Sequence, residues 1–238
     1  MTNMAGRVVL VTGGSGNLGS ACAEAVAADG GGVVLVDRDE ARLRARHQKL
    51  AGDPRHLMIG GVDLTSPAEV ERAVGRVVER FGRIDGLVNT VGGFAGGAVV
   101  HEEDPGTFAR MFALNFTTAL LTCRAVIPHM LAARRGSIVN VGSRDALRPR
   151  ARYAAYGLSK AAVLHLTAVL SDEVRSRGVR VNCVLPGTMD TPENRAAMPD
   201  ADTSGWVAPS AVAETIRFLL SDGARAVHGA AIPVTGTG

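Results

Sequence analysis

The chain has 238 residues, of which 46% are hydrophobic and 21% are charged, and its formal net charge is +3. This length and composition allow a sizeable core and argue against disorder, and because no Pro-, Ser- or Gly-rich linker divides the chain we expect one domain over residues 1–238. The Lys and Arg residues are dispersed, and no apolar run approaches the roughly 18 residues of a membrane span, so neither nucleic acid nor membrane is expected as a partner.

Short apolar runs of strand length alternate along the chain with segments of helical periodicity. The expected strands cover residues 7–11, 32–36, 56–60, 84–89, 137–141, 179–185 and 230–234. The expected helices cover residues 18–29, 39–50, 67–81, 104–133, 153–177 and 209–222. This alternation indicates βαβ units, and continuous Val, Ile and Leu strands indicate helices on both sheet faces. We therefore predict a doubly wound α/β fold of Rossmann type with a seven-stranded parallel sheet.

The segment VTGGSGNLGS, residues 11–20, follows the first strand and opens the first helix. Glycines allow a tight turn there and let N–H groups at the helix N-terminus meet a pyrophosphate. No Lys-Ser/Thr pair follows, which excludes a P-loop. A glycine-rich turn is a weak signal by itself, because any tight strand-to-helix turn can use one. The expected dinucleotide contacts are Gly13, Ser15, Asn17, Leu18 and Gly19.

The second strand ends at Asp37, at the distance after the glycines where a carboxylate binds the adenosine ribose hydroxyls. Its negative charge would repel a 2′-phosphate, which favours NAD as the cofactor. Arg38 follows directly and can pair with a 2′-phosphate, so NADP stays an alternative. After the third strand, Asp63 and Leu64 in VDLT are expected beside the adenine, with a helix-capping Asp63 as the alternative.

Tyr156 and Lys160 in YGLSK are spaced i,i+4, so both side chains project from one face of a helix. A phenol with its ordinary pKa of about 10 exchanges protons poorly near neutral pH, but a neighbouring ammonium favours the phenolate. Tyr156 can then act as a general acid/base, and Ser143, just after the fifth strand, can bond a substrate oxygen. A Tyr packed over a Lys stem is the alternative for the pair alone.

Taken in order, these motifs resemble the short-chain dehydrogenase/reductase family over essentially the whole chain. The motifs are the glycine loop at 12–19, NTVG at 89–92, Asn115 in LNFTT, Ser143, Tyr156 with Lys160, and PG at 186–187. The resemblance implies hydride transfer between a nicotinamide cofactor and a small carbonyl or alcohol. Many members read TGxxxGxG and have glycine where this chain has Asn17, which leaves open which N–H groups contact phosphate.

The resemblance also implies a role for each matching residue. Tyr156 would be the general acid/base, Lys160 would lower its pKa and bind the nicotinamide ribose, and Ser143 would orient the substrate oxygen. Asn115 would hold a water that relays protons through Lys160 to solvent. Further cofactor contacts would come from Asn89, Val91 and Gly92 on the adenosine side, and from Pro186, Gly187, Met189 and Thr191 on the nicotinamide side.

Three segments, at 13–20, 91–97 and 188–206, resemble dihydropteridine reductases and their bacterial relatives. Those reductases have the Tyr/Lys pair but lack the serine found here as Ser143, which suits a ketone or alcohol that needs a second hydrogen bond. Pterin reduction therefore stays an alternative. A cofactor-binding sensor without catalysis is a third hypothesis, and the intact set of Asn115, Ser143, Tyr156 and Lys160 argues against it.

The substrate side of the sequence is rich in arginine. Arg144, Arg148, Arg150 and Arg152 follow Ser143, and Arg195 lies in the expected lid. An anionic substrate is one explanation, and a solvated loop or a subunit contact is the other. Phe94, Met198 and Trp206 can form an apolar wall, although Trp206 can equally anchor the lid.

The helices over 104–133 and 153–177 have broad apolar faces. In the family the corresponding helices pack between subunits, which implies a homotetramer or homodimer; burial on their own sheet is the alternative. Cys22, Cys123 and Cys183 form no CxxC pair, and the six histidines have no metal-binding spacing. With no signal-peptide pattern at the start, we expect a cytoplasmic protein without disulfides or a metal.

Overall fold

The valine-rich runs of the sequence form the strands of one parallel sheet in the computed structural model, which describes residues 3–236. The strands are β1 (Val8–Thr12), β2 (Gly32–Val36), β3 (Leu57–Ile59), β4 (Gly86–Asn89), β5 (Gly136–Val141), β6 (Val179–Pro186) and β7 (Ala231–Val234). They lie in the order β3-β2-β1-β4-β5-β6-β7. The strand order reverses at β1 and β4, because β2 and β3 are added on one side of β1 and β4 to β7 on the other. Open α/β sheets bind ligands at such a switch point.

Eight α-helices connect these strands within the described residues. They are α1 (Asn17–Ala28), α2 (Glu40–Arg46), α3 (Pro67–Phe81), α4 (Pro105–Met111), α5 (Thr118–Ala132), α6 (Ala154–Val174), α7 (Pro192–Ala197) and α8 (Pro209–Leu220). Proline at the first position starts α3, α4, α7 and α8, where its fixed φ suits a helix and its missing N–H has no intrahelical partner to lose.

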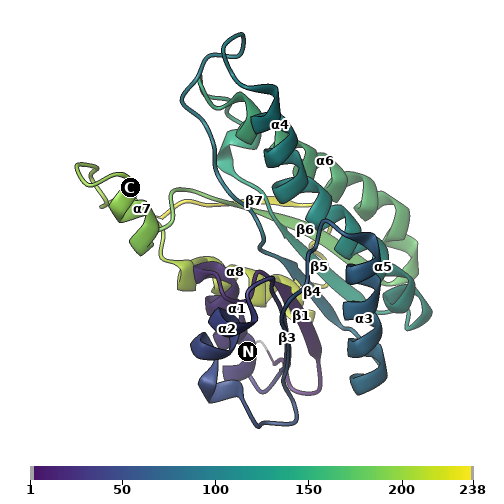
Figure 1. The fold of residues 1–238 in the computed structure, drawn as a ribbon. Coiled ribbons are helices and arrows are strands. Elements are labelled where there is room, and N and C mark those ends of the chain that lie inside the picture. The colour runs from purple at the N-terminus through teal and green to yellow at the C-terminus, as the bar shows by residue number, and fades with distance from the viewer. Residues whose placement is uncertain (1–2, 237–238) are drawn as a thin grey trace.

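Neighbouring residues of the central strands pack on opposite faces of the sheet. Val9 and Val11 join a core cluster with α1 and α8, whereas Val8 and Leu10 join one with α3, α5 and α6. Figure 1 shows α3, α5 and α6 on one side of the sheet and α1, α2 and α8 on the other. Both faces are therefore apolar, and polar chemistry is left to the loops at the strand ends.

The predicted fold class is confirmed. The helix predicted over residues 39–50 ends at Arg46 and is followed by a 3-10 turn, Gln48–Leu50, and two further elements differ from the sequence prediction. A π-helical segment, Phe112–Thr117, separates α4 from α5 where one continuous helix is predicted. Hydrophobic periodicity does not detect it, because a single wider turn leaves the apolar face of the helix almost unchanged. The second element is α7, which is too short to show a periodic face and is started by its cap, with Thr191 Oγ1 accepting from the Asn194 N–H at 3.2 Å.

The helical run Pro105–Ala132 is long and apolar enough, by length and composition, to cross a membrane. Polar residues interrupt this run, and some of them, such as Thr118 and Thr122, are buried in the structure. Thr122 Oγ1, for example, donates to Asn89 Oδ1 of β4 at 2.6 Å. The run is therefore a core helix layer of the α/β fold.

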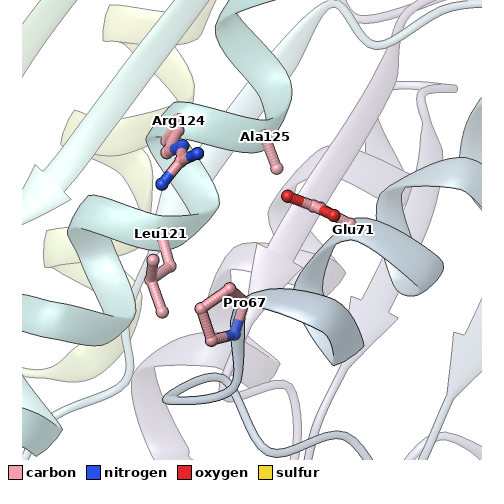
Figure 2. Close-up of a pocket in the computed structure, with 5 residues that line it drawn as sticks. All are labelled: Pro67, Glu71, Leu121, Arg124 and Ala125. Atoms are coloured by element: carbon pink, nitrogen blue, oxygen red, sulfur yellow. The ribbon is translucent and has the colours of Figure 1, made fainter.

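A small hollow lies between α3 and α5 (Figure 2). It measures about 10 Å³ and is lined by Pro67 and Glu71 of α3 and by Leu121, Arg124 and Ala125 of α5. A space of this size holds at most about one water. None of the predicted cofactor or substrate residues lines it, so it is not the candidate active site.

Candidate active site

The glycine loop between β1 and α1 is shaped so that only glycine fits at its closest approach. Gly13 has φ +67°, and a Cβ on Gly19 would lie 2.2 Å from the Gly13 carbonyl oxygen. The loop is closed by the Gly13 and Gly14 N–H groups, which both donate to the Val36 carbonyl. The N–H groups of the first turn of α1, which begins at Asn17, have no intrahelical acceptors. This is a cradle for an anion at a helix N-terminus.

Asp37 lies beside this cradle at the end of β2. Its Oδ2 accepts from the Ser15 N–H at 2.9 Å and its Oδ1 from the Asp39 N–H at 3.1 Å. The carboxylate is thus fixed in orientation, and each oxygen still has a lone pair for a hydroxyl donor. Arg38 is exposed. Hydrogen bonds from Thr65 lower the pKa of Asp63, and the charge of Arg38 adds a smaller effect in the same direction.

Asp63 and Leu64 have structural roles in this molecule. Asp63 Oδ1 accepts from the N–H and hydroxyl of Thr65, at 2.9 and 2.7 Å, which closes a turn just before α3, whose N-cap residue is Ser66. Leu64 is buried in the core on the α3 side of the sheet. The backbone of this turn and Asp63 Oδ2 remain available to a ligand.

Asn89 also points away from the cleft. Its Nδ2 donates to Asn140 Oδ1 at 2.9 Å, and the Asn140 Nδ2 continues the chain to Thr167 Oγ1 at 2.9 Å. This buried amide chain links β4, β5 and α6 beneath the strand ends. Of the NTVG motif, Val91 and Gly92 lie in the loop beyond it, and there a Cβ on Gly92 would lie 2.8 Å from Asn115 Oδ1.

Asn115 is held in the π-helical segment and is almost fully buried. Its Oδ1 accepts from the Gly93 N–H at 2.8 Å, and its Nδ2 donates to the Gly93 carbonyl at 3.1 Å and to Ser159 Oγ at 2.9 Å. The amide thus clamps the β4 loop against α6. Single π turns often occur at functional sites, where they move one side chain inward.

Lys160, Ser143 and Tyr156 meet at the carboxyl end of β5. Lys160 is buried and its Nζ donates to the Val141 carbonyl at 2.9 Å; burial lowers the pKa of its ammonium to about 8. Burial raises the pKa of Tyr156, and the hydrogen bond with Ser143 opposes this rise. Of the neighbouring charges, Asp145 adds to the rise in the pKa of Tyr156 and Arg150 opposes it. The role expected of Lys160 in lowering this pKa stays a prediction.

Asp145 is a polar group of the site that the sequence reasoning misses. Its Oδ2 accepts from Ser143 Oγ at 3.2 Å, and Arg150 binds the same carboxylate through Nε at 2.6 Å and Nη2 at 3.1 Å. In the sequence, Asp145 is a single acid in an arginine-rich loop, and only its position two residues after Ser143 could have indicated the contact.

An aromatic cluster closes the substrate side. The Phe94 ring makes edge contacts with Tyr153 and Tyr156, with centroids 4.9 and 5.1 Å apart, and the Arg150 guanidinium lies 4.3 Å above the Tyr153 ring. Phe94, Leu147 and Met198 are exposed apolar side chains on the three loops that follow β4, β5 and β6.

Most of the arginines on this side are already engaged. Arg150 pairs with Asp145, Arg195 pairs with Asp190 at 2.5 Å, and Arg152 Nη1 donates to the Gly97 carbonyl at 2.8 Å. Arg144 and Arg148 are exposed on the same loop. The engaged arginines favour a structural use of the loop over recognition of an anion.

The segment after β6 contacts the end of the glycine loop through α7. The Gly187 N–H donates to the Val234 carbonyl at 3.0 Å, which directs the chain from Pro186 toward Met189 and α7. At α7, Glu193 Oε2 accepts from Asn17 Nδ2 at 2.7 Å. Asn17, where many family members have glycine, is thus a contact between the cradle and this lid. Trp206 is half-buried behind the lid, and Thr191 is buried at the cap of α7.

Replacing Gly92 with alanine tests the packing of this site. The added Cβ would lie 3.1 Å from Lys160 Nζ as well as against Asn115, so both must shift. We expect kcat/KM to fall about 10- to 100-fold with little change in melting temperature. Gly75→Ala is the matched control, because nothing lies within 4 Å of its Cβ on α3. Unchanged kcat/KM in Gly92→Ala would show that these positions are not critical.

A family comparison is decisive at this point, because the short chain dehydrogenase family model matches residues 7–202. The chain belongs to the short chain dehydrogenase family. The 2-(S)-hydroxypropyl-CoM dehydrogenase 3 of Xanthobacter autotrophicus is 33% identical, with 96% of this chain and 95% of that protein aligned. The cis-4-hydroxycyclohexanecarboxylate dehydrogenase of Sinomonas cyclohexanicum is 36% identical over 97% of this chain and 95% of its own length.

Solved structures agree with this assignment. A crystal structure of NAD⁺-bound xylitol dehydrogenase superposes on the chain with a TM-score of 0.85 at 27% identity, covering 98% of this chain and 99% of that one. The protein is therefore an oxidoreductase of a family that binds nicotinamide cofactors and whose named members act on alcohols. The glycine cradle and the fixed carboxylate of Asp37 fit a dinucleotide.

Proposed function

We propose that this short chain dehydrogenase interconverts a small secondary alcohol and its ketone with NAD as the cofactor. The observation that carries the proposal is the meeting of Tyr156, Ser143, Lys160 and Asn115 at the ends of β4 and β5, next to the glycine cradle. When bound, the nicotinamide supplies the hydride acceptor or donor, and the chain supplies the proton chemistry.

In this proposal Tyr156 exchanges the proton of the substrate oxygen. In ketone reduction the neutral phenol donates its proton, and in alcohol oxidation the phenolate accepts one. Ser143 holds the substrate oxygen beside Tyr156 with a second hydrogen bond. Lys160, fixed by the Val141 carbonyl, would bind the nicotinamide ribose, and Asn115 would complete a proton path to solvent through a water.

Cofactor choice would follow from Asp37. The glycine loop residues Gly13, Ser15, Leu18 and Gly19 would contact the pyrophosphate, and the Asp37 carboxylate would accept from the ribose hydroxyls. A 2′-phosphate would place two anions together beside the fixed carboxylate. Arg38 is exposed, and we propose that its solvated charge does not offset the fixed carboxylate of Asp37.

We expect NADH to bind at least about tenfold more tightly than NADPH in a fluorescence titration. Asp37→Ser should narrow that ratio about tenfold, because the repulsion of the 2′-phosphate is removed. Asp39→Ser is the control, since it removes a neighbouring charge and keeps a residue able to cap α2. Tighter binding of NADPH to the unmodified protein would overturn the proposed cofactor.

The substrate class follows from the apolar wall and from the relatives. Phe94, Leu147 and Met198 offer apolar contacts, and the relatives include a dehydrogenase named for a hydroxycyclohexane acid. We propose a small substrate with a compact hydrocarbon portion, cyclic or branched. A turnover panel of such ketones together with a quinonoid dihydropterin separates this substrate class from pterin reduction.

We also propose that the enzyme is a cytoplasmic homotetramer or homodimer. Within one chain, only 44% of the most apolar part of the run Pro105–Ala132 is buried. Leu158 and Val169 of α6, which covers the same face of the sheet, are also exposed. A second copy of the chain would cover this surface. The three cysteines are buried and free, which suits a reducing compartment.

A further inference from the structure

The charged groups that surround Tyr156 are few and can be named. Lys160 lies one turn along α6, and its ammonium bonds the Val141 carbonyl. The loop after β5 contributes the charged residues Asp145 and Arg150. The loop after β4 contacts Tyr156 only through the uncharged ring of Phe94. On the lid, Asp190 and Arg195 pair with each other. Asp145 accepts from Ser143, the hydrogen-bond partner of Tyr156, and Arg150 binds Asp145, so both charges lie close to the phenol. Their effects on the pKa of Tyr156 are opposite and add to the larger effects of burial and of the Ser143 bond.

Asp145 is the inner member of this pair and Arg150 the outer one. The Asp145 side chain is 11% exposed, whereas that of Arg150 is 56% exposed. Arg150 binds the carboxylate through two nitrogens, a geometry that fixes both side chains. Its stacking on the Tyr153 ring, which itself contacts Phe94, restrains the guanidinium further. Such a buttressed pair is more than a solvated surface contact.

The contact with Ser143 gives Asp145 a role in the site. A carboxylate only accepts hydrogen bonds, so Ser143 Oγ must donate its proton to Asp145 Oδ2. The Asp145 N–H in turn donates to Ser143 Oγ at 3.2 Å. Both contacts fix the rotamer of Ser143 beside Tyr156. When Ser143 turns its proton to a substrate oxygen, the two bonds from Arg150 still satisfy the carboxylate.

We propose that Asp145 is a positioning residue for Ser143 and that the opposed charges of Asp145 and Arg150 shift the pH range in which Tyr156 exchanges its proton. This inference rests on the proposed function for its meaning in catalysis. The effect of the two opposed charges on the ionisation of Tyr156 can be measured without turnover.

The direction of each effect follows from electrostatics. The negative charge of Asp145 disfavours the phenolate, so Asp145→Asn should make Tyr156 ionise at lower pH. The positive charge of Arg150 favours the phenolate, so Arg150→Gln should make it ionise at higher pH. Each shift should be about 0.3 to 1 pH unit for a charge at this range in a half-buried site.

The chain offers a direct readout, because it contains only two tyrosines, Tyr153 and Tyr156. In a Tyr153→Phe background, which keeps the ring that contacts Phe94 and Arg150, the near-ultraviolet absorbance of tyrosinate reports Tyr156 alone. Titrating this background with and without Asp145→Asn or Arg150→Gln gives the two shifts. The pH profile of kcat/KM for alcohol oxidation, where Tyr156 must be ionised, should move with them.

The control is Arg148→Gln, which removes the same charge from an exposed position of the same loop. We expect opposite shifts for Asp145→Asn and Arg150→Gln, and a smaller shift for Arg148→Gln. Shifts in the same direction, no shift, or an equal shift in Arg148→Gln would overturn the proposal. If the unmodified protein turns over no alcohol or ketone but the opposite shifts appear, the proposed function fails while the electrostatic pair stands.

Discussion

Replacing Tyr156 with phenylalanine is expected to lower kcat by about 10²- to 10⁴-fold. The ring would keep its edge contact with Phe94, and only the hydroxyl beside Ser143 would be lost. The fold and the binding of NADH should therefore be preserved. Steady-state kinetics with a ketone and NADH measure the loss, and circular dichroism with an NADH titration checks that the variant is folded and loaded.

The control for this prediction is Tyr153→Phe. Tyr153 contacts the same Phe94 ring, so its replacement removes a phenol at nearly the same place without removing the proposed acid. Its kcat should change by less than about tenfold. If Tyr156→Phe keeps turnover close to that of Tyr153→Phe, the phenol of Tyr156 is not the group that moves the proton.

Lys160→Met is expected to make the protein more stable at neutral pH and to lower kcat/KM about 10²-fold or more. Lys160 is buried, and burial lowers the pKa of its ammonium from 10.5 to about 8. Below pH 8 the folded protein therefore holds a buried charge whose desolvation is unfavourable. Methionine has a similar shape, so the variant should gain on the order of 2 kcal/mol, after loss of the bond to the Val141 carbonyl.

The sign of the pH dependence is fixed by the same shift. Between about pH 8 and pH 10.5 the unfolded chain keeps the Lys160 proton and the folded protein has lost it, so the free energy of unfolding rises with pH. Urea unfolding of the unmodified protein at several pH values in this window should show that rise. In Lys160→Met the free energy of unfolding should rise less with pH, because the contribution of Lys160 is absent. A variant that is less stable at pH 7, with an unchanged pH slope, would contradict this account.

The sequence predicts the sheet well because the strands are buried on both faces. Val8 to Val11 form an unbroken apolar run, and no other element type matches such short runs separated by periodic helices. The glycine loop and Asp37 are also foreseeable, because their spacing from β1 and β2 is set by the winding of the sheet. Tyr156 and Lys160 follow from helical spacing.

Side-chain direction is what the sequence leaves open. Asn89 lies at the end of β4 and is expected at the cofactor, yet its amide turns inward to Asn140. Asp145 contacts Ser143 from within an arginine-rich loop. Glu193 contacts Asn17, which lies far from it in the sequence. Such contacts depend on rotamers and loop paths, which neither periodicity nor spacing encodes.

The oxidation of NADH with a panel of small cyclic and branched ketones should be measured first, in parallel on the unmodified protein and on Tyr156→Phe. We expect loss of NADH absorbance with at least one ketone and near-complete loss of that rate in the variant. Tight NADH binding without turnover of any ketone, or equal rates in the two proteins, would contradict it.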